Sequence, residues 1–154
     1  MIDNIPPPRQ PTEGQPQRRF FAYYRTATGS IQVRHQQLEC ERLVVRLDGT
    51  IAGYAADVGS GLRMSDLPGY LRLLGAVTAR DVHAVVASDL SRFGRDLREL
   101  AQLFELCDQN GVEIWDARIG RLAAHHILQP GSSPLRRLPQ SYRPNSSDHE
   151  DSNG

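Results

Sequence analysis

Four short apolar runs recur along the chain, and longer segments of helical periodicity separate them. Aromatic and β-branched residues dominate the runs, and polar or turn-forming residues bound them, which is typical of strands in a buried sheet. The third run reads VHAVVASD, so it predicts a strand covered on both faces. We expect strands at residues 20–25, 50–57, 82–89 and 112–116.

The clearest helix is predicted between the third and fourth strands. Its apolar residues fall at i, i+3, i+4, i+7 and i+10, which places them on one face of a helix. They are Leu97, Leu100, Ala101, Phe104 and Cys107. Gly111 is expected to end the helix, because glycine adopts the left-handed conformation of a C-cap without strain.

Two further helices are predicted from weaker patterns. Residues 31–47 have apolar positions at 31, 38 and 45, with 43 and 47 nearby, and Ser30 is the expected N-cap. Residues 67–80 have a proline in the first turn, with Asp66 as the expected N-cap. The expected apolar face of the second helix consists of Leu67, Tyr70, Leu71, Leu74 and Val77.

This alternation predicts an α/β fold, with a mostly parallel four- to five-stranded sheet and helices on both faces. Residues 118–128 are expected to add a short helix. The ends of the chain differ from this middle, because nine of the ten prolines lie in residues 1–16 and 130–144. We therefore expect three parts: a disordered Pro/Gln-rich tail (1–19), one domain (20–120), and a short helix followed by a disordered tail (121–154).

Composition excludes several classes of protein. The 154 residues include 18 arginines, no lysine and 18 acidic residues, so the net charge is zero. Broad electrostatic attachment to DNA is therefore not expected, because phosphate neutralisation supplies most non-specific affinity. No stretch approaches the roughly 20 apolar residues of a membrane span, and the N-terminus lacks the apolar run of a secretory signal. We expect a cytoplasmic protein that does not bind membranes.

Neither a disulfide framework nor a metal site is expected. Cys40 and Cys107 both fall on predicted helices, and short cysteine spacings are absent. A metal ion needs clustered ligands, whereas the two cysteines and five histidines are scattered. His125 and His126 are adjacent, so on a helix they would point in different directions.

Three arginines follow the predicted strands, at the edge of the sheet where ligands of such folds gather. Arg25 ends the first strand, and Arg92 and Arg95 follow the third. Arginine forks match phosphate oxygens, so convergence of these side chains would make an anion site. The alternatives are solvated loop arginines, or structural ion pairs with acids of the same segments. These acids are Asp57, Asp89 and Asp96.

Four motifs lie at or near the same edge. YYRTAT covers 23–28, Gln36 lies on the following helix, DVGSGL covers 57–62, and DLSRFGRD covers 89–96. They resemble the Tyr-x-Arg-x-Ser-Thr pattern, the helix glutamine, the Asp-x-x-Ser-Gly loop and the Asp-Leu-Ser-Arg-Leu-Gly-Arg-Asp run of the resolvase/invertase serine recombinases. The resemblance covers roughly residues 20–117. The loop is especially similar to that of the serine transposase subgroup that mobilises small insertion sequences.

The resemblance implies chemistry on DNA phosphodiesters. In this family a serine hydroxyl attacks the backbone phosphate to form a covalent phosphoserine link, and strands are exchanged within a tetramer without a metal or cofactor. Arginines stabilise charge on the phosphoryl oxygens in transit. The catalytic positions carried over to this sequence are Arg25, Ala27, Asp57, Ser60, Arg92 and Arg95. The DNA phosphate contacts carried over are Arg25, Gln36, Arg92 and Arg95.

The chain departs from the family at the nucleophile, where Ala27 replaces the serine. Thr26 and Thr28 flank it, but neighbours on an extended segment point to opposite faces, so neither simply replaces the serine. Ser30 lies beyond a glycine turn. Asp66 stands nine residues after the loop aspartate, where the family commonly has an arginine. Two losses at one site favour natural catalytic impairment over an engineered knockout.

The ends of the chain also bear on the expected function. Family members continue into a long helix and a DNA-binding domain, whereas residues 118–128 supply only about three turns before Pro130. We expect DNA to be a weak or indirect partner of a homodimer or of a heterodimer with a recombinase. The leading interpretation is an impaired serine recombinase-like protein of site-specific DNA recombination. The alternatives are a non-catalytic regulator that pairs with an active recombinase, and a truncated relic.

Overall fold

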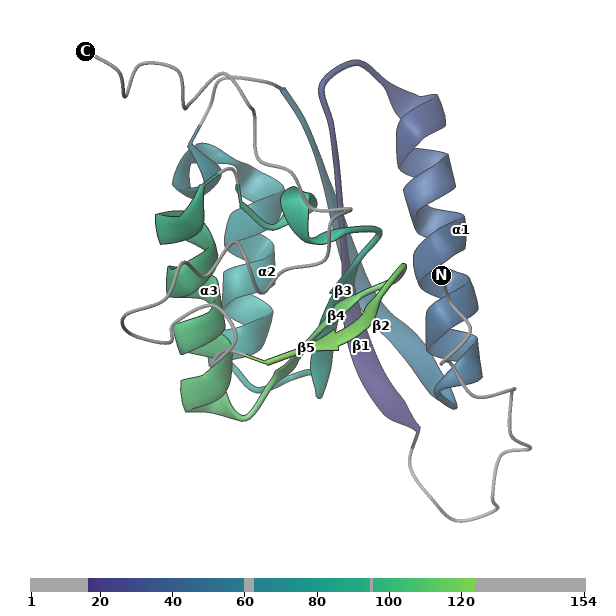
Figure 1. Ribbon diagram of the computed structural model, residues 1–154, viewed down its shortest axis with the longest axis vertical. Helices are drawn as coiled ribbons and strands as arrows, with labels where there is room; N and C mark the ends of the chain where they lie inside the picture. Colours follow the sequence, from purple (N-terminus) through teal and green to yellow (C-terminus); the bar gives the residue numbers. More distant parts are fainter. Residues whose placement is uncertain (1–16, 60–62, 95, 124–154) are drawn as a thin grey trace.

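The computed structural model describes residues 17–59, 63–94 and 96–123, which form a five-stranded sheet between two layers of helices (Figure 1). The strand order is β2-β1-β3-β4-β5, and only β5 is antiparallel to its neighbour. The strands are β1 (Arg18–Thr26), β2 (Gly49–Val58), β3 (Ala84–Ala87), β4 (Glu113–Asp116) and β5 (Gly120–Leu122). The helices are α1 (Ser30–Arg46), α2 (Pro68–Thr78) and α3 (Leu97–Asn110). The predicted α/β class and mostly parallel sheet are confirmed.

Alternation along β1 divides the core into two halves. Successive strand residues point to opposite faces, and both faces of this central strand are covered. On one face Phe20, Ala22 and Tyr24 pack with the buried side of α1, and on the other Phe21 and Tyr23 pack with α2 and α3. Figure 1 shows α1 on one side of the sheet, with α2 and α3 together on the other.

The two cysteines lie in opposite halves of this core. Cys40 packs under α1, whereas Cys107 packs on the α2 and α3 side. Both are free thiols, and burial raises the pKa of each. The sheet separates them, so they cannot pair within one chain.

The buried face of α1 differs from the apolar row that defined it in the sequence. Cys40, Leu43 and Val44 are buried against the sheet, together with Gln36. The predicted row is exposed instead: Ile31 by 74%, Leu38 by 43% and Val45 by 59%. Two apolar faces compete on this helix, and the sheet is covered by the one that also carries Gln36 and Cys40.

The start of α2 and its buried face also differ from the prediction. The helix begins at Pro68 with Leu67 as its N-cap, and Asp66 lies in a preceding 3-10 turn without capping the helix. Leu73 is buried where the pattern favoured Leu71, which is 50% exposed. The N-cap of α1 shifts likewise, since Ser30 is its first helical residue. By contrast, Gly111 is confirmed as the left-handed C-cap of α3, with φ of 68°.

The helix predicted over residues 118–128 is wrong for the part that the structure describes. After β4 the chain turns back into β5, which pairs antiparallel with it. Oδ1 of Asp116 accepts from the N–H groups of Arg118 at 2.8 Å and Ile119 at 3.1 Å, which holds the turn. Gly120 follows with φ of 107°, a conformation that favours glycine. Residues 124–128 lie outside the described part.

Asp116 predicts a pH dependence of stability. The carboxylate is buried, and burial raises its pKa from 3.8 to about 6, despite hydrogen bonds from Arg118, Leu90 and Ile119. The folded protein therefore binds this proton more tightly than the unfolded chain. The contribution of Asp116 to stability is greatest below about pH 4 and is lost as the pH rises to about 6. A shift of about two units corresponds to roughly 3 kcal/mol.

We expect Asp116→Asn to remove this part of the pH dependence. Urea unfolding of the wild type and the variant at several pH values between about 4 and 7 gives the free energy of unfolding of each protein. The difference between the two curves isolates Asp116, because the other carboxylates contribute equally to both. Parallel stability curves for the wild type and the variant would contradict the assignment.

Candidate active site

The end of β1 carries two of the predicted site residues. Arg25 is paired with Asp57 of β2 in the sheet register, and its Nη1 donates to Sδ of Met64 at 3.2 Å. Ala27 follows the strand and is exposed. Because β1 lies between the parallel strands β2 and β3, its carboxyl end is at the ligand-binding edge of the sheet. The predicted nucleophile position is therefore open to solvent at this edge.

Gln36 of α1 holds the backbone of Arg25. The pairing of β1 with β3 ends at Ala22, and beyond it the side-chain amide of Gln36 takes the place of a strand. Its Oε1 accepts from the Arg25 N–H at 2.9 Å, and its Nε2 donates to the Arg25 carbonyl at 2.8 Å. Gln36 is 3% exposed. This geometry makes it a positioning residue for Arg25, and a direct contact with DNA phosphate stays a prediction.

Arg92 reaches the same place from the loop after β3. Its Nη1 donates to the carbonyl oxygen of Arg25 at 3.0 Å, and its Nε lies 3.4 Å from Oδ2 of Asp89 in an ion pair. Asp89 also accepts from the N–H of Ser91 at 3.1 Å, which caps the short 3-10 helix Leu90–Arg92. The buried Nε of Arg92 makes no hydrogen bond within the described residues. Arg92 thus lies beside Arg25 and forms an ion pair with Asp89, which the sequence analysis named as a possible partner.

Asp57 is occupied by the start of α2. The residue is 5% exposed, and its Oδ1 accepts from the N–H of Gly69 at 2.8 Å. Its Oδ2 accepts from the N–H of Tyr70 at 2.8 Å and from the hydroxyl of Tyr23 at 2.6 Å. A helix N-terminus leaves N–H groups without partners inside the helix, and a carboxylate there also complements the helix dipole. Asp57 therefore joins β2 to α2 in this structure.

The surroundings of Asp57 leave it little freedom. A Cβ atom on Gly69 would lie 2.8 Å from both carboxylate oxygens, so only glycine fits. Tyr23 stacks on Phe93 with ring centroids 6.4 Å apart, and it meets Tyr70 edge-on at 5.7 Å. Burial raises the pKa of the Tyr23 hydroxyl, and the hydrogen bond to Asp57 raises it further. This hydroxyl is therefore a donor to Asp57 and remains protonated.

The hydroxyl of Thr26 is also committed. Thr26 is buried, and its Oγ1 donates to Oε1 of Gln32 at 2.6 Å. The same oxygen accepts from the N–H groups of Thr28 at 3.2 Å and Gly29 at 3.3 Å, closing the turn into α1. This hydroxyl faces inward at the turn, away from the exposed side at Ala27. Thr28 and Ser30 are exposed.

The structure brings together only part of the predicted set. Arg25, Asp57 and Arg92 lie at one edge of the sheet with Ala27, and Gln36 supports Arg25 from α1. The remaining two, Ser60 and Arg95, lie outside the described residues. Among the described residues, no group of three or more histidine, cysteine and acidic side chains is placed to hold a metal ion. No helix there is long and apolar enough to cross a membrane.

Sequence reasoning missed Tyr23, Gly69 and Tyr70 as partners of Asp57. The sequence signals only the aromatic character of the two tyrosines, which any buried strand or helix can use. One signal did exist: Pro68 marks the first turn of a helix whose N–H groups need an acceptor. Asp66 and Asp57 both precede that turn, and proximity in sequence favoured Asp66.

Comparison with known proteins decides the family. The family model described as "Resolvase, N terminal domain" matches residues 20–127. The chain belongs to this family. The resemblance noted at the four motifs is thereby confirmed, and the protein is a resolvase-type domain of the DNA recombination family.

Solved structures support the same fold for this resolvase-type domain. The C-terminal catalytic domain of ISC1926 TnpA, an IS607-like serine recombinase, is 22% identical with a TM-score of 0.59 over 64% of this chain and 67% of that one. The N-terminal catalytic domain of TP901-1 integrase is 18% identical with a TM-score of 0.60 over 67% and 79%. A serine recombinase from Sulfolobus solfataricus is 29% identical with a TM-score of 0.53 over 64% and 66%. A comparison with curated protein sequences finds no match.

Proposed function

We propose that this resolvase-type domain is catalytically impaired and keeps the phosphate-binding half of a serine recombinase site. The reaction of an intact site is transfer of a DNA phosphoryl group to a serine hydroxyl, with release of a sugar hydroxyl. Such a site needs a nucleophile and cations that stabilise charge on the phosphoryl oxygens. This chain supplies part of the cation set, without the nucleophile.

The observation that carries the proposal is the exposed methyl group of Ala27 at the end of β1. It stands at the serine position of the family motif, next to a strand end that holds Arg25 and Arg92. The adjacent hydroxyl of Thr26 is buried and bonded to Gln32, so it does not replace the serine. Asp66 is exposed at the same edge, where a family arginine would add positive charge.

The arginines support phosphate binding through their placement. The Arg92 guanidinium is anchored at Nη1 by the Arg25 carbonyl and at Nε by Asp89. Anchoring lowers the entropy lost when a phosphate oxygen is bound, which is the advantage of a preorganised site. Gln36 fixes the backbone of Arg25 in the same way. We propose Arg25, Arg92 and Arg95 as the phosphate contacts, and Ser60 stays a predicted site residue.

The proposed biological role is association with DNA and with recombinase chains rather than strand cleavage. The net charge of zero supports a weak or indirect contact with DNA. Regulation of an active recombinase by an impaired chain is the second candidate, and the exposed apolar row of α1 favours it because such a row needs a partner. Both roles place the protein in the cytoplasm with DNA.

The unmodified protein is expected to form no covalent adduct with DNA. Supercoiled plasmid carrying candidate sites is incubated with the protein, and denaturing gels detect any protein that remains attached to DNA. An adduct from the unmodified chain would overturn the proposed impairment. Peptide mapping of that adduct would then identify the hydroxyl used, with Thr28 and Ser30 as the exposed possibilities next to Ala27.

A further inference from the structure

Asp116 holds the 3-10 helix Leu90–Arg92, which carries Arg92 to the candidate site. Its Oδ2 accepts from the N–H of Leu90 at 2.9 Å, although the two residues are 26 positions apart. Asp116 is 3% exposed and Leu90 is 0% exposed, so water does not compete for this bond. Leu90 and Arg92 belong to a single helical turn. The place of the Leu90 N–H group therefore fixes the place of Arg92.

Asp89 and Asp116 stabilise this turn in different ways. Asp89 accepts from the N–H of Ser91 two residues later, so it shapes the turn from within. Asp116 is the last residue of β4 and is paired with Ala87 of β3, so its bond joins the turn to the sheet. Among the described residues, no other group accepts from the N–H of Leu90. Without the carboxylate of Asp116, the turn would lose its attachment to the sheet.

The contact between Arg92 and Arg25 depends on where this turn lies. Nη1 of Arg92 donates to the carbonyl oxygen of Arg25 at 3.0 Å, and such bonds weaken beyond about 3.2 Å. The Arg92 side chain is 31% exposed and its Nε is buried, so it has little freedom to compensate. A displacement of the turn by about 1 Å would break the contact, and misplacement on this scale lowers the strength of a site markedly.

We propose that Asp116, as a carboxylate, is a positioning residue for Arg92, because it holds the turn that brings the guanidinium to Arg25 and to a DNA phosphate. Asp116 lies outside the four motifs and acts through the backbone of Leu90. The proposal rests on the proposed function, since its effect on binding requires that Arg92 contacts phosphate. The position of Arg92 itself can be measured without DNA.

Protonation of Asp116 is expected to release the turn. The carboxylate accepts from three N–H groups, those of Leu90, Arg118 and Ile119. A protonated carboxyl replaces one acceptor site by a donor, so the three groups then compete for fewer acceptors. Burial raises the pKa of Asp116 to about 6. Release of the turn is therefore expected as the pH falls from about 7 to about 5.

Other titratable and charged groups face Asp116 from three elements. Asp89 faces it from the 3-10 helix, and its negative charge raises the pKa of Asp116. Cys40 faces it from α1, and burial raises the pKa of this thiol, which stays protonated. The guanidinium of Arg118 faces it from the turn after β4 and is paired with Glu39 of α1 at 3.0 Å. The variant Asp116→Asn separates the titration of Asp116 from that of the two neighbouring acids.

NMR of the full chain tests the positioning in the absence of DNA. As the pH is lowered from about 7.5 to about 5, the amide signal of Leu90 and the Nε–H signal of Arg92 are expected to shift together. The expected midpoint is at about pH 6, the pKa of Asp116. Asp116→Asn is expected to abolish both shifts. An Arg92 signal that does not follow that of Leu90, or the same shifts in the variant, would overturn the proposal.

Fluorescence anisotropy with a short DNA duplex at low salt tests the consequence for binding. Arg92→Ala is expected to weaken binding by about tenfold, because a charge-assisted hydrogen bond is lost. Asp116→Asn is expected to weaken it by at least about threefold, because Arg92 is then misplaced. The direction of the change is informative. Removing a negative charge near an anion site strengthens binding electrostatically, so a loss reports position rather than charge.

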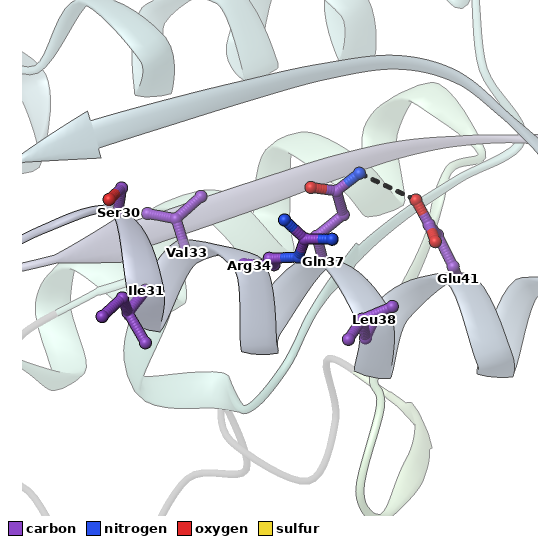
Figure 2. A pocket seen from close by; sticks show the side chains of 7 residues that line it. All are labelled: Ser30, Ile31, Val33, Arg34, Gln37, Leu38 and Glu41. Carbon is purple, nitrogen blue, oxygen red and sulfur yellow. Dashed lines mark hydrogen bonds between the residues drawn. The ribbon is translucent and has the colours of Figure 1, made fainter.

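Glu41→Gln is the control for charge. It removes the same charge from the outer face of α1, where Figure 2 shows Glu41 beside a shallow groove and bonded to Gln37 at 2.9 Å. A glutamine there can keep this bond, and the control is expected not to weaken binding. If Glu41→Gln and Asp116→Asn weakened binding equally, the positioning role of Asp116 would be excluded.

The pH dependence separates positioning from a purely structural role. Relative to Asp116→Asn, the unmodified chain is expected to gain stability but to lose affinity for DNA as the pH falls from about 7 to about 5. A structural role alone would move both in the same direction. If Arg92→Ala weakens binding and Asp116→Asn does not, the positioning proposal is overturned. If Arg92→Ala leaves the affinity unchanged while the NMR signals shift as expected, the phosphate role of Arg92 fails and its positioning by Asp116 stands.

Discussion

Replacing Asp57 by alanine is expected to lower the free energy of unfolding by about 3 to 5 kcal/mol. The substitution leaves three donors without an acceptor in a site that is almost closed to water. These are the hydroxyl of Tyr23 and the N–H groups of Gly69 and Tyr70. Each buried, unsatisfied donor costs about 1 to 3 kcal/mol, and the total is less than additive because α2 can shift.

Two further variants isolate the cause. Asp66→Ala removes the neighbouring acid, which is exposed and does not cap α2, so a loss below about 0.5 kcal/mol is expected. Gly69→Ala keeps Asp57 but places a Cβ atom 2.8 Å from its oxygens, and is expected to destabilise in the same direction as Asp57→Ala. Urea unfolding measures all three. Equal losses for Asp57→Ala and Asp66→Ala would contradict the anchoring role of Asp57.

The anchoring role affects how a variant of Asp57 can be interpreted. A domain has roughly 5 to 15 kcal/mol of stability in total, so Asp57→Ala removes a large part of it. Loss of activity or binding in such a variant would follow from the displaced α2, without any contact between Asp57 and DNA. The catalytic role that the resemblance assigns to Asp57 stays a prediction, and only variants that remain fully folded can test it.

The second large effect is a gain of chemistry. The double variant Ala27→Ser and Asp66→Arg is expected to form a covalent phosphoserine adduct with DNA that the unmodified chain does not form. Both positions are exposed, so the new side chains require no repacking of the core. The serine supplies the hydroxyl without which no adduct can form. The restored cation is expected to raise the rate of adduct formation by a factor of about 100 or more.

The experiment is most informative when weak binding to DNA does not limit formation of the adduct. A zinc-finger module fused to the protein, with its recognition sequence flanking the target, raises the effective concentration of the domain at the DNA. Denaturing gels then detect the adduct. Adding Arg92→Ala to the double variant is expected to abolish it, whereas adding Arg72→Ala, an exposed arginine of α2, is expected to leave it unchanged. An adduct that survives the loss of Arg92 would contradict the phosphate role of that residue.

Local pattern predicted the elements well where one face of a segment was unambiguous. The apolar residues of α3 recur at helical spacing and Gly111 ends it, so its extent and four of its contacts with the core follow from the sequence. The run at β3 is apolar throughout, and all four residues of the strand are buried. In α1 the same reasoning selected the wrong face, because two apolar rows occupy one helix and periodicity does not say which of them meets the sheet.

For the candidate site, the sequence predicted where the residues lie but not which groups they bind. The sequence placed Arg25, Asp57 and Arg92 at or after the ends of strands whose carboxyl ends lie at one edge of the sheet, because the parallel direction of the strands follows from the alternation of elements. It did not say which partners these groups choose. That choice depends on atoms brought within 3 Å from distant segments, such as Tyr23 and Gly69 for Asp57.

The sequence by itself determined the α/β class, the edge at which the arginines gather, the family and the absence of a serine at position 27. Each of these is a property of residue type and order. Only the tertiary structure decided that Asp57 anchors α2, that Gln36 replaces a strand beside Arg25, and that the row at Ile31 faces solvent. The reason is physical: a hydrogen-bond partner or a buried face is chosen by competition among groups that are close in space, and sequence spacing alone does not rank them.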